Sequence, residues 1–349
     1  MNNILVIGGA GFIGSHVAFE LKINGYNVVV LDNLCRGHRY IVEDVLKLPL
    51  IVGSFGDPGL LETVLCGQHP ACSYPIDAVV HLAAYAYVGE SFENPLQYYE
   101  NNVAKTISLL DVLLRIGLSR EHLSSSARHI PLVFSSTCAT FGNPSDPTLC
   151  LDEDHEQKPI NPYGRSKLMI EWILKDVYDS HGFPSTALRY FNAAGSHKSI
   201  AIGELHVPET HLIPLALEAA YGSRPYLQVF GNDYSTPDGT CLRDYIHVMD
   251  LAHAHLLSLK HQQLAAGHFQ FNLGSGAATS VLQVVDAVER VTGRNVPLKF
   301  QARRLGDPPF LSASSNKAMK VLGWIPSRSG IDEIVSDASR WYSQNVLSR

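Results

Sequence analysis

The sequence predicts an α/β protein in which a doubly wound parallel sheet is followed by a smaller C-terminal α/β domain. Short apolar runs alternate with helical patterns through the first half of the chain, as they do in βαβ units. A glycine-rich turn at residues 8–14 joins the first apolar run to the first helix. The 349 residues correspond to roughly two domains, and the 46% that are hydrophobic can form a sizeable core.

The predicted elements follow in chain order. Strands are expected at residues 4–7, 28–31, 78–82, 132–135 and 185–190. Helices are expected between them at 12–22, 60–65, 95–116 and 164–181, which gives a first domain over residues 1–192. The second domain, residues 193–349, begins with loops at 195–210 and 231–240 and has helices at 281–292 and 331–344. This boundary is approximate, and segments of the two domains can interleave.

Composition excludes several classes of protein. The net charge is −6, from 27 basic and 33 acidic residues, so no nucleic-acid surface is expected. No apolar run approaches the roughly 18 residues of a membrane helix, and the N-terminus lacks a basic start or a cleavage site, which predicts a cytoplasmic protein. The six cysteines form no CxxC pair, and histidines such as His247 show no metal-ligand spacing, so reduced thiols and no metal are expected.

The glycine-rich turn predicts a dinucleotide site of the Rossmann type. Gly8 and Gly11 permit a tight turn whose backbone can approach a pyrophosphate, and Gly14 lets the helix pack on the sheet. A glycine triplet alone is weak, but this one follows a strand and opens a helix. Asp32 ends the second strand, where a carboxylate would bind an adenosine ribose and repel a 2′-phosphate, so NAD is favoured over NADP. Arg36 nearby points the other way, because a guanidinium could bind that phosphate.

A tyrosine and a lysine predict carbinol–carbonyl chemistry. Tyr163 and Lys167 are four residues apart, which places them on one helix face, and an ammonium there can lower the pKa of the phenol. Thr137 follows a strand and offers a hydroxyl that can bind the substrate oxygen whose proton moves. An isolated pair of this kind would more often be a surface tyrosine beside a solvated lysine.

These residues resemble the extended short-chain dehydrogenases/reductases, and within them the UDP-glucose 4-epimerase family. The resemblance spans the chain and rests on motifs from both halves, among them HLAAYAYVGES from His81, FSSTCATFG from Phe134, NPYGRSKLM from Asn161, PETHLIP from Pro208 and NLGSG from Asn272. It implies C4 epimerisation of a UDP-sugar by reversible hydride transfer to a tightly held NAD through a 4-keto intermediate. Tyr163 would take the O4 proton, Thr137 would take the place of the family's serine or threonine, and Lys167 would support Tyr163.

The resemblance also implies binding residues. The expected NAD contacts are Gly8, Gly11, Phe12, Ile13, Gly14, Asp32, Asn33, Ser54, Phe55, Leu82, Ala83, Ala84, Asn102, Ser135, Tyr163, Lys167 and Tyr190. The expected UDP-sugar contacts are Ala86, Thr137, Tyr163, Asn192, His211, Leu212, Arg243, Arg304, Asp307 and Leu311. Three positions depart from the family pattern: Ser54 replaces an aspartate near the adenine, Ala86 a lysine, and His211 an asparagine. A homodimer through the helices at 95–116 and 164–181 is expected as well.

Other activities remain open. A dehydratase or a decarboxylase on the same scaffold would need a carboxylate just after Thr137, where Cys138 and Ala139 stand. A non-catalytic NAD-binding sensor would have little use for Thr137, Tyr163 and Lys167 together. Leu311 stands where the family sets the size of the sugar, and its intermediate bulk favours UDP-glucose and UDP-galactose while leaving a UDP-pentose or a UDP-N-acetylhexosamine open.

Overall fold

The computed structural model describes residues 1–120, 129–144, 150–304 and 308–347. The chain divides into two compact units whose segments interleave in sequence. Unit 1 comprises Met1–Gly142, Pro159–Arg189 and Ala252–Phe271, and unit 2 comprises Asn143–Lys158, Tyr190–Leu251 and Asn272–Arg349. Within the described ranges no helix is long and apolar enough to cross a membrane.

A seven-stranded sheet forms the centre of unit 1, with the strand order β10-β6-β5-β4-β1-β2-β3. The pairs that join β3, β2, β1, β4 and β5 are parallel, and this order is that of the doubly wound nucleotide-binding folds. The strands are β1 (Asn3–Ile7), β2 (Asn27–Asp32), β3 (Leu50–Val52), β4 (Ala78–His81), β5 (Leu132–Thr137), β6 (Ser185–Tyr190) and β10 (His268–Leu273).

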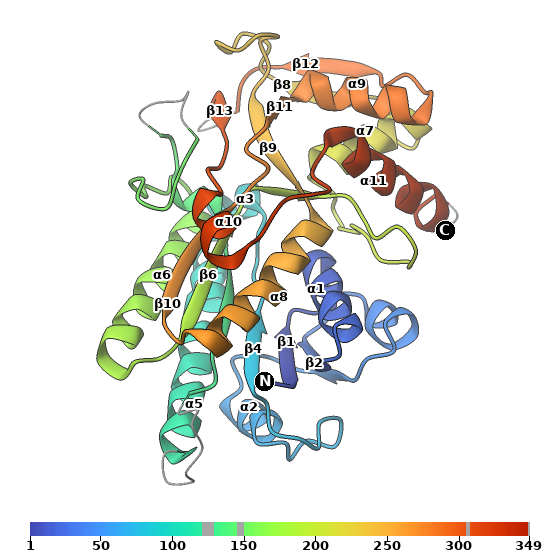
Figure 1. Cartoon of the computed structure of the whole chain (residues 1–349). Helices are drawn as coiled ribbons and strands as arrows, with labels where there is room; N and C mark the ends of the chain where they lie inside the picture. The colour runs from blue at the N-terminus through green and yellow to red at the C-terminus, as the bar shows by residue number, and fades with distance from the viewer. Residues whose placement is uncertain (121–128, 145–149, 305–307, 348–349) are drawn as a thin grey trace. The chain divides into compact units, whose positions relative to one another are not determined.

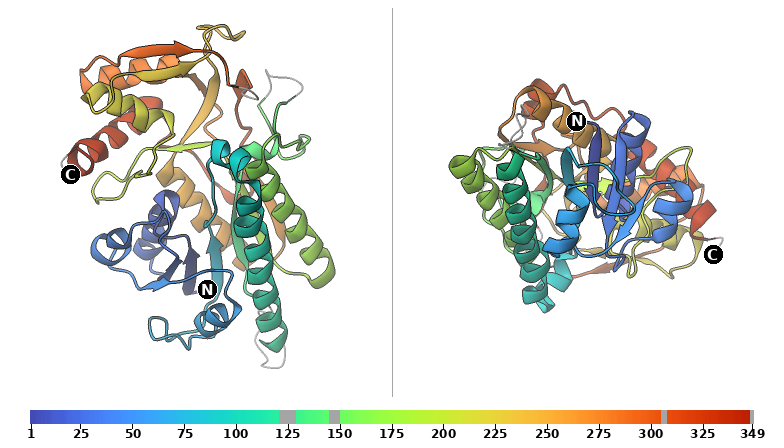
Figure 2. Two further views of the ribbon diagram at one scale, coloured as in Figure 1. Left: turned by 180° about the vertical axis from the view of Figure 1, so that it is seen from behind. Right: turned by 90° about the horizontal axis from the view of Figure 1, so that it is seen from below.

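Helices cover both faces of this sheet (Figure 1). The helices α1 (Phe12–Ile23) and α8 (Val248–Leu264) lie on one face, where His253 of α8 contacts Glu20 of α1. The helices α2 (Pro58–Leu65), α5 (Lys105–Arg120) and α6 (Pro162–His181) lie on the other, and Figure 2 shows α5 and α6 running side by side. The predicted fold class is therefore confirmed.

The structure differs from the sequence prediction in several elements. The helix expected at 95–116 consists of α4 (Pro95–Tyr98), a π-helical segment η2 (Tyr99–Ala104) and α5. The short helix α3 (Val88–Glu93), the π-helical segment η1 (Ile41–Val45), the 3-10 turn η4 (Cys138–Thr140) and the strands β3 and β10 were not expected. Strand β10 joins the edge of the sheet beside β6, so a late part of the chain completes unit 1.

Unit 2 is built from smaller sheets and helices. Strand β9 (Leu242–His247) pairs with β7 (Asn192–Ala194), β11 (Ala278–Ser280) and β13 (Phe310–Leu311), and β8 (Leu227–Phe230) pairs with β12 (Leu298–Gln301). Its helices are α7 (Leu212–Tyr221), α9 (Val281–Thr292), α10 (Asn316–Leu322) and α11 (Ile331–Asn345). Buried side chains of α7, α9 and α11, such as Leu217, Val288 and Ile334, form its apolar core.

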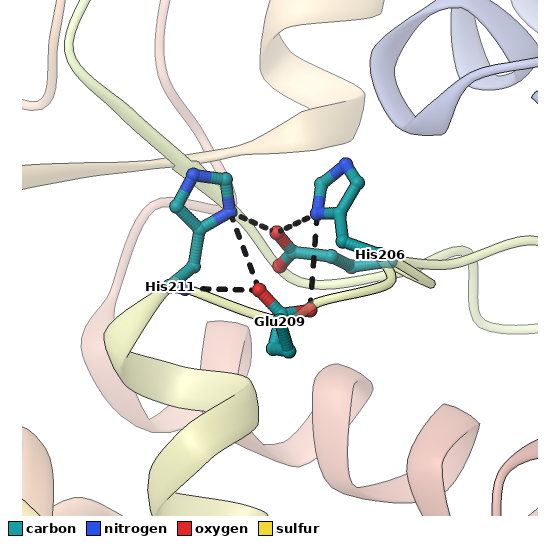
Figure 3. Close-up of side chains that lie close together, drawn as sticks. His206, Glu209 and His211 are labelled. Carbon is teal, nitrogen blue, oxygen red and sulfur yellow. Dashed lines mark hydrogen bonds and ion pairs between the residues drawn. The ribbon is translucent and has the colours of Figure 1, made fainter. Parts of the chain in front are cut away.

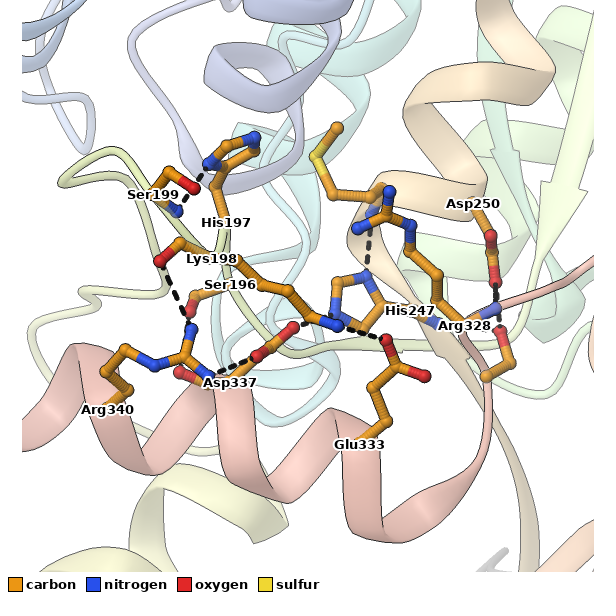
Figure 4. Close-up of polar contacts among 12 residues, drawn as sticks. Ser196, His197, Lys198, Ser199, His247, Asp250, Arg328, Glu333, Asp337 and Arg340 are labelled. Carbon is orange, nitrogen blue, oxygen red and sulfur yellow. Dashed lines mark hydrogen bonds and ion pairs between the residues drawn. The ribbon is translucent and has the colours of Figure 1, made fainter.

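A polar network fastens α11 to the other parts of unit 2 (Figure 4). The buried His247, at the end of β9, contacts the Asp337 carboxylate at 3.2 Å, and Arg340 binds the same carboxylate at 2.7 Å. Ser196 donates to the Asp337 carbonyl at 2.7 Å. His247 is therefore part of the buried hydrogen-bonding network that holds α11.

Candidate active site

The turn between β1 and α1 brings backbone unusually close to backbone. Gly8 has φ +83°, and a Cβ there would lie 2.5 Å from the amide nitrogen of Ala83. A Cβ on Gly14 would lie 2.1 Å from the Gly8 carbonyl oxygen. Gly11 is the N-cap of α1 and has no side chain to cap it, and the first turn contains no acidic residue. The backbone amides of Phe12, Ile13 and Gly14 therefore begin the helix without a side-chain cap. This cradle suits an anionic group at the helix N-terminus.

Asp32 lies beside this turn, as predicted. Its carboxylate accepts hydrogen bonds from the amides of Ala10 at 3.0 Å and Leu34 at 2.8 Å. Burial raises the pKa of Asp32, and those two amides partly offset the rise. Arg36, the residue that favoured a 2′-phosphate, forms an ion pair with Glu90 at 2.7 Å and stacks on the Tyr87 ring at 4.1 Å. Because Glu90 already pairs with the Arg36 guanidinium, Arg36 is less suited to bind a 2′-phosphate, and the residues at the end of β2 favour NAD over NADP.

The other predicted cofactor residues of unit 1 surround the carboxyl ends of the strands. Leu82 and Ala83 follow β4 and donate to the Ile7 carbonyl at 2.9 and 3.1 Å. Asn102 is buried in η2, where its side chain accepts from the Tyr85 amide at 2.9 Å and donates to Ser166 of α6 at 3.1 Å. Asn102 thus ties the segment after β4 to the helix that carries Tyr163. The remaining members vary in exposure: Ala84 is half-buried, Asn33 exposed, Ser54 half-buried and Phe55 buried.

The segment at Ser54 bears on adenine recognition. Ser54 Oγ accepts from the Gly56 amide at 3.1 Å, so the hydroxyl stabilises its own turn. Asp57, which could substitute for the missing aspartate, caps α2 by accepting from the Leu60 amide at 3.1 Å. Both side chains have local structural roles in this strand-to-helix connection.

Strand β5 and helix α6 bring the three predicted catalytic residues together. The Thr137 hydroxyl, at the end of β5, hydrogen-bonds the phenol of Tyr163 in the first turn of α6. Lys167, one turn further along α6, is buried and donates to the Ser135 carbonyl at 2.6 Å. Asn161 caps α6 by accepting from the Gly164 amide at 2.7 Å, which fixes where the helix begins. A hydroxyl, a phenol and the amine of a lysine thus converge at the carboxyl end of β5.

The pKa values depart from the sequence expectation. Burial raises the pKa of Tyr163 to about 12, and the hydrogen bond from Thr137 offsets only part of that rise. Burial also lowers the pKa of Lys167 to about 7, while Glu171 acts in the opposite direction. The expected lowering of the phenol pKa by Lys167 is absent from this arrangement, because the ammonium is directed to the Ser135 carbonyl and the site is dry.

A buried ion pair behind these residues was not predicted. Glu171 of α6 binds the Arg189 guanidinium of β6 at 2.6 Å, and both side chains are at most 1% exposed. The Ser136 hydroxyl, between Ser135 and Thr137 on β5, donates to the same carboxylate. The sequence carries a signal for Glu171, because residues 163, 167 and 171 repeat every four positions and therefore share one face of α6. Its partner Arg189 comes from a distant strand that no local pattern identifies.

Three of the predicted sugar-binding residues lie on β9 or on strands that pair with it. Arg243 lies in β9, and Leu311 of β13 stands opposite it in the pairing register, so the two half-buried side chains are neighbours. Asn192 of β7 pairs with Tyr245 of the same strand β9. Asp244 does not form a solvated ion pair with Arg243; it is fully buried and accepts from Ser275, Gly276, Ser312 and Ala313.

The other predicted sugar-binding residues are more dispersed. Arg304 is exposed, and its guanidinium lies over the Phe230 ring at 3.8 Å. His211 is the N-cap residue of α7, and Leu212 is its first residue. Tyr190, expected at the cofactor, is buried at the end of β6, and Ala86 is exposed after β4. Asp307 lies outside the described residues.

The fold and the site together are those of a dinucleotide-binding protein in which a threonine, a tyrosine and a lysine meet at the carboxyl end of β5. Comparison with known proteins gives the family: residues 4–274 match the NAD dependent epimerase/dehydratase family. The chain belongs to this family.

Relatives extend the similarity over nearly the whole chain. A UDP-glucose 4-epimerase from Rhizobium leguminosarum bv. trifolii is 44% identical over 343 residues, covering 98% of each chain. The crystal structure of UDP-glucose 4-epimerase from Brucella ovis in complex with NAD is 46% identical with a TM-score of 0.88, covering 97% of this chain and 98% of that one. The UDP-Glc/GlcNAc 4-epimerase of Campylobacter jejuni is 36% identical with a TM-score of 0.81, covering 99% and 100%.

Proposed function

We propose that the chain is an NAD-dependent epimerase that inverts C4 of a UDP-sugar, with UDP-glucose and UDP-galactose as its main pair. The observation that carries this proposal is the convergence of Thr137, Tyr163 and Lys167 at the carboxyl end of β5, two strands from the β1 strand that leads into the glycine turn. The relatives named above act on UDP-glucose, and the family is NAD dependent. Unit 1 is accordingly the NAD-binding part and unit 2 the UDP-sugar-binding part.

The residues present fit NAD. The cradle at Gly8 and Gly14 leaves room only for backbone, and the uncapped N-terminus of α1 suits a pyrophosphate. Asp32 presents a carboxylate to a ribose, and Glu90 holds Arg36 in an ion pair. When bound, NAD supplies a reversible acceptor for the hydride of C4.

The chain's own side chains then manage one proton. The Tyr163 phenolate accepts the proton of the sugar O4 and returns it at the end of the turnover. Thr137, which hydrogen-bonds the Tyr163 phenol, would bind that same oxygen and orient it toward Tyr163. Arg243 supplies a guanidinium for the diphosphate, and Leu311 beside it limits the space for the sugar. Because the proton and the hydride are both returned, no redox equivalent is consumed.

Alternative substrates are supported by particular relatives. The Campylobacter jejuni enzyme is described as a UDP-Glc/GlcNAc epimerase, and a Stenotrophomonas maltophila relative, 35% identical, was crystallised with NAD and formylated UDP-arabinopyranose. Leu311 is half-buried, which is compatible with a pocket wall that admits an N-acetyl sugar or a pentose. A dehydratase or decarboxylase is disfavoured because Cys138 and Ala139 follow Thr137 in η4.

We also propose a cytoplasmic homodimer formed through α5 and α6. These helices expose large apolar side chains, with Trp172 59%, Ile107 47% and Leu118 39% exposed. Clustered apolar exposure of this kind is typical of protein interfaces. None of the six cysteines, all of which lie among the described residues, forms a disulfide, in keeping with a reducing compartment.

Product identification tests the proposed function. The purified chain, without added cofactor, is incubated separately with UDP-glucose, UDP-xylose and UDP-N-acetylglucosamine, and the nucleotide sugars are separated by chromatography. We expect UDP-galactose as the main product from UDP-glucose, and NAD on denaturation of the protein. Absence of any 4-epimer, even with NAD supplied, would contradict the proposal, and recovery of mainly NADP would contradict the role of Asp32.

A further inference from the structure

Four side chains of unit 2 bring their polar atoms together on the loop that precedes α7 (Figure 3). Glu204, His206, Glu209 and His211 each offer one nitrogen or carboxylate oxygen, and these four atoms lie within 4.8 Å of one another. The four residues occupy only eight positions of the sequence, so a single loop supplies the whole group. The sequence motifs predicted His211 at the sugar and no metal.

The two carboxylates of this cluster are nearly dry. The Glu204 side chain is 6% exposed and that of Glu209 is 8% exposed. Buried carboxylates require compensating positive charge or hydrogen bonds. Glu209 Oε1 accepts hydrogen bonds from the backbone amides of Thr210 at 2.7 Å and His211 at 2.9 Å. The remaining compensation within the cluster comes from protons on the two imidazoles or from a bound cation.

Three of the four histidine–carboxylate separations in this cluster suit a shared cation. His206 Nδ1 lies 3.2 Å from Glu204 Oε1 and 3.8 Å from Glu209 Oε2. His211 Nδ1 contacts Glu204 Oε1 directly and lies 3.8 Å from Glu209 Oε1. Ligands held about 2.0–2.2 Å from a tetrahedral ion are about 3.4 Å apart, and three of the four separations are close to this value. Glu204 and His211, which are in direct contact, would have to move apart to share an ion. Both histidines offer the same ring nitrogen, Nδ1, to the centre of the cluster.

The donor set indicates the class of ion. Two neutral imidazoles and two carboxylates carry a net charge of −2, which a divalent cation neutralises. Imidazole nitrogen suits zinc and its transition-metal neighbours, whereas magnesium and calcium prefer oxygen ligands alone. A hydrogen bond also fixes the backbone of the loop, because the Trp341 indole donates to the Glu204 carbonyl at 2.8 Å. A bound ion would therefore meet ligands whose backbone is already partly fixed.

We propose that Glu204, His206, Glu209 and His211 form a four-coordinate site for one divalent transition-metal ion of the zinc class. The ion ties together the loop that leads into α7. Since His211 caps α7 and Leu212 begins it, occupancy of the site fixes the start of the helix to which two expected sugar contacts belong. Ligation through Nδ1 leaves the Nε2 edge of His211 for a different partner.

Metal uptake by the full chain with its bound nucleotide tests the site. The protein is treated with a chelator, dialysed and titrated with Zn²⁺ by calorimetry and with Co²⁺ by visible absorption. We expect about one Zn²⁺ per chain and the intense visible bands of four-coordinate Co²⁺. Because the Trp341 indole is bonded to the Glu204 backbone, we also expect Co²⁺ to quench its fluorescence.

Matched variants separate this site from other histidines. Glu209→Gln and His206→Gln should each lose the tight site and the Co²⁺ bands, while His253→Gln, which removes an imidazole paired with Glu20 alone, should keep both. Retention of the bound nucleotide and an unchanged thermal melt establish that each variant is folded; if one is not, Glu204→Gln replaces it. Zn²⁺ uptake that is equal in wild type and folded cluster variants would overturn the proposal. So would an absence of uptake in the wild type, which would assign the compensating charge to protons.

Discussion

At the scale of single residues, burial shifts the pKa values of Tyr163 and Lys167 in opposite directions. Burial favours the neutral form of each, so it raises the pKa of the phenol to about 12 and lowers the pKa of the amine to about 7. Each residue is therefore favoured in its neutral form, the phenol with its proton and the amine without one. A phenolate or an ammonium in this site must be stabilised by the molecule that binds beside it. Acid–base work in this site is therefore coupled to binding.

Tyr163→Phe removes the proposed proton acceptor and leaves the aromatic ring. We expect turnover of UDP-glucose to fall by about 10²-fold or more while UDP-sugar binding changes little, because only the proton-transfer group is lost. Steady-state kinetics and calorimetric titration with UDP measure the two quantities. Turnover close to that of the wild type would contradict the role of Tyr163.

Lys167 predicts a pH dependence of stability. Its pKa falls from an ordinary 10.5 to about 7 on folding, so between these values the unfolded chain holds more protons than the folded chain. The contribution of Lys167 to the free energy of unfolding therefore rises with pH between these two values. Below about pH 7 the folded chain carries the full cost of burying the charged ammonium. Urea unfolding at about pH 7 and about pH 10 should show a larger gain for the wild type than for Lys167→Met. Lys175→Met, on the exposed part of α6, serves as the control and should keep the wild-type gain; equal gains in wild type and Lys167→Met would contradict the prediction.

At the scale of elements, one carboxylate joins the two elements that carry the chemistry. Strand β5 provides Ser135 and Thr137, and α6 provides Tyr163 and Lys167. Glu171 accepts from Ser136 between the two β5 residues and binds Arg189 of the next strand, β6. The relative position of strand end and helix, and with it the Thr137–Tyr163 hydrogen bond, depends on this buried network.

Glu171→Gln is expected to destabilise the chain strongly. Removing one partner of a buried ion pair leaves the Arg189 charge uncompensated, at a cost of about 3–5 kcal/mol in the free energy of unfolding. Urea denaturation measures this cost, and turnover should fall as well because β5 and α6 lose their anchor. Lys175→Ala breaks an exposed pair with Asp179 on the same helix and should cost less than about 1 kcal/mol. A loss in Glu171→Gln no larger than in this control would show that the pair contributes little.

Strand β13 connects sugar preference to the sheet of unit 2. Leu311 pairs in register with Arg243, is half-buried, and is not among the side chains of the apolar core of unit 2. Leu311→Tyr fills this space, and we expect it to abolish activity on UDP-N-acetylglucosamine while sparing UDP-galactose. Steady-state kinetics of the wild type and the variant on UDP-N-acetylglucosamine and UDP-galactose test whether Leu311 sets the sugar preference. Equal losses on the two sugars would assign Leu311 to packing.

At the scale of the whole molecule, local pattern predicted the βαβ units but not how distant segments complete them. The strands β1, β2, β4, β5 and β6 are apolar runs beside regular helices, and all were predicted. Strand β10 was missed because its place beside β6 depends on pairing across a long stretch of chain, which no local periodicity encodes. The turn at Gly8 and the convergence of Tyr163 with Thr137 followed from motif spacing. The Glu171–Arg189 pair and the cluster at Glu204 required the folded chain, because their partners meet only through tertiary contact or loop geometry.

Assembly provides the last prediction. The exposed Trp172 of α6 and Ile107 of α5 belong to helices that run side by side, and burying them against a second copy would remove a large apolar surface from water (Figure 2). Trp172→Glu places a charge in that interface, so we expect the dimer measured by sedimentation or light scattering to shift to monomer. Leu264→Glu introduces the same charge at an 88% exposed leucine of α8 and should leave the mass unchanged. A wild type that is already monomeric at micromolar concentration, or a Trp172→Glu variant that remains dimeric, would exclude α6 from the interface.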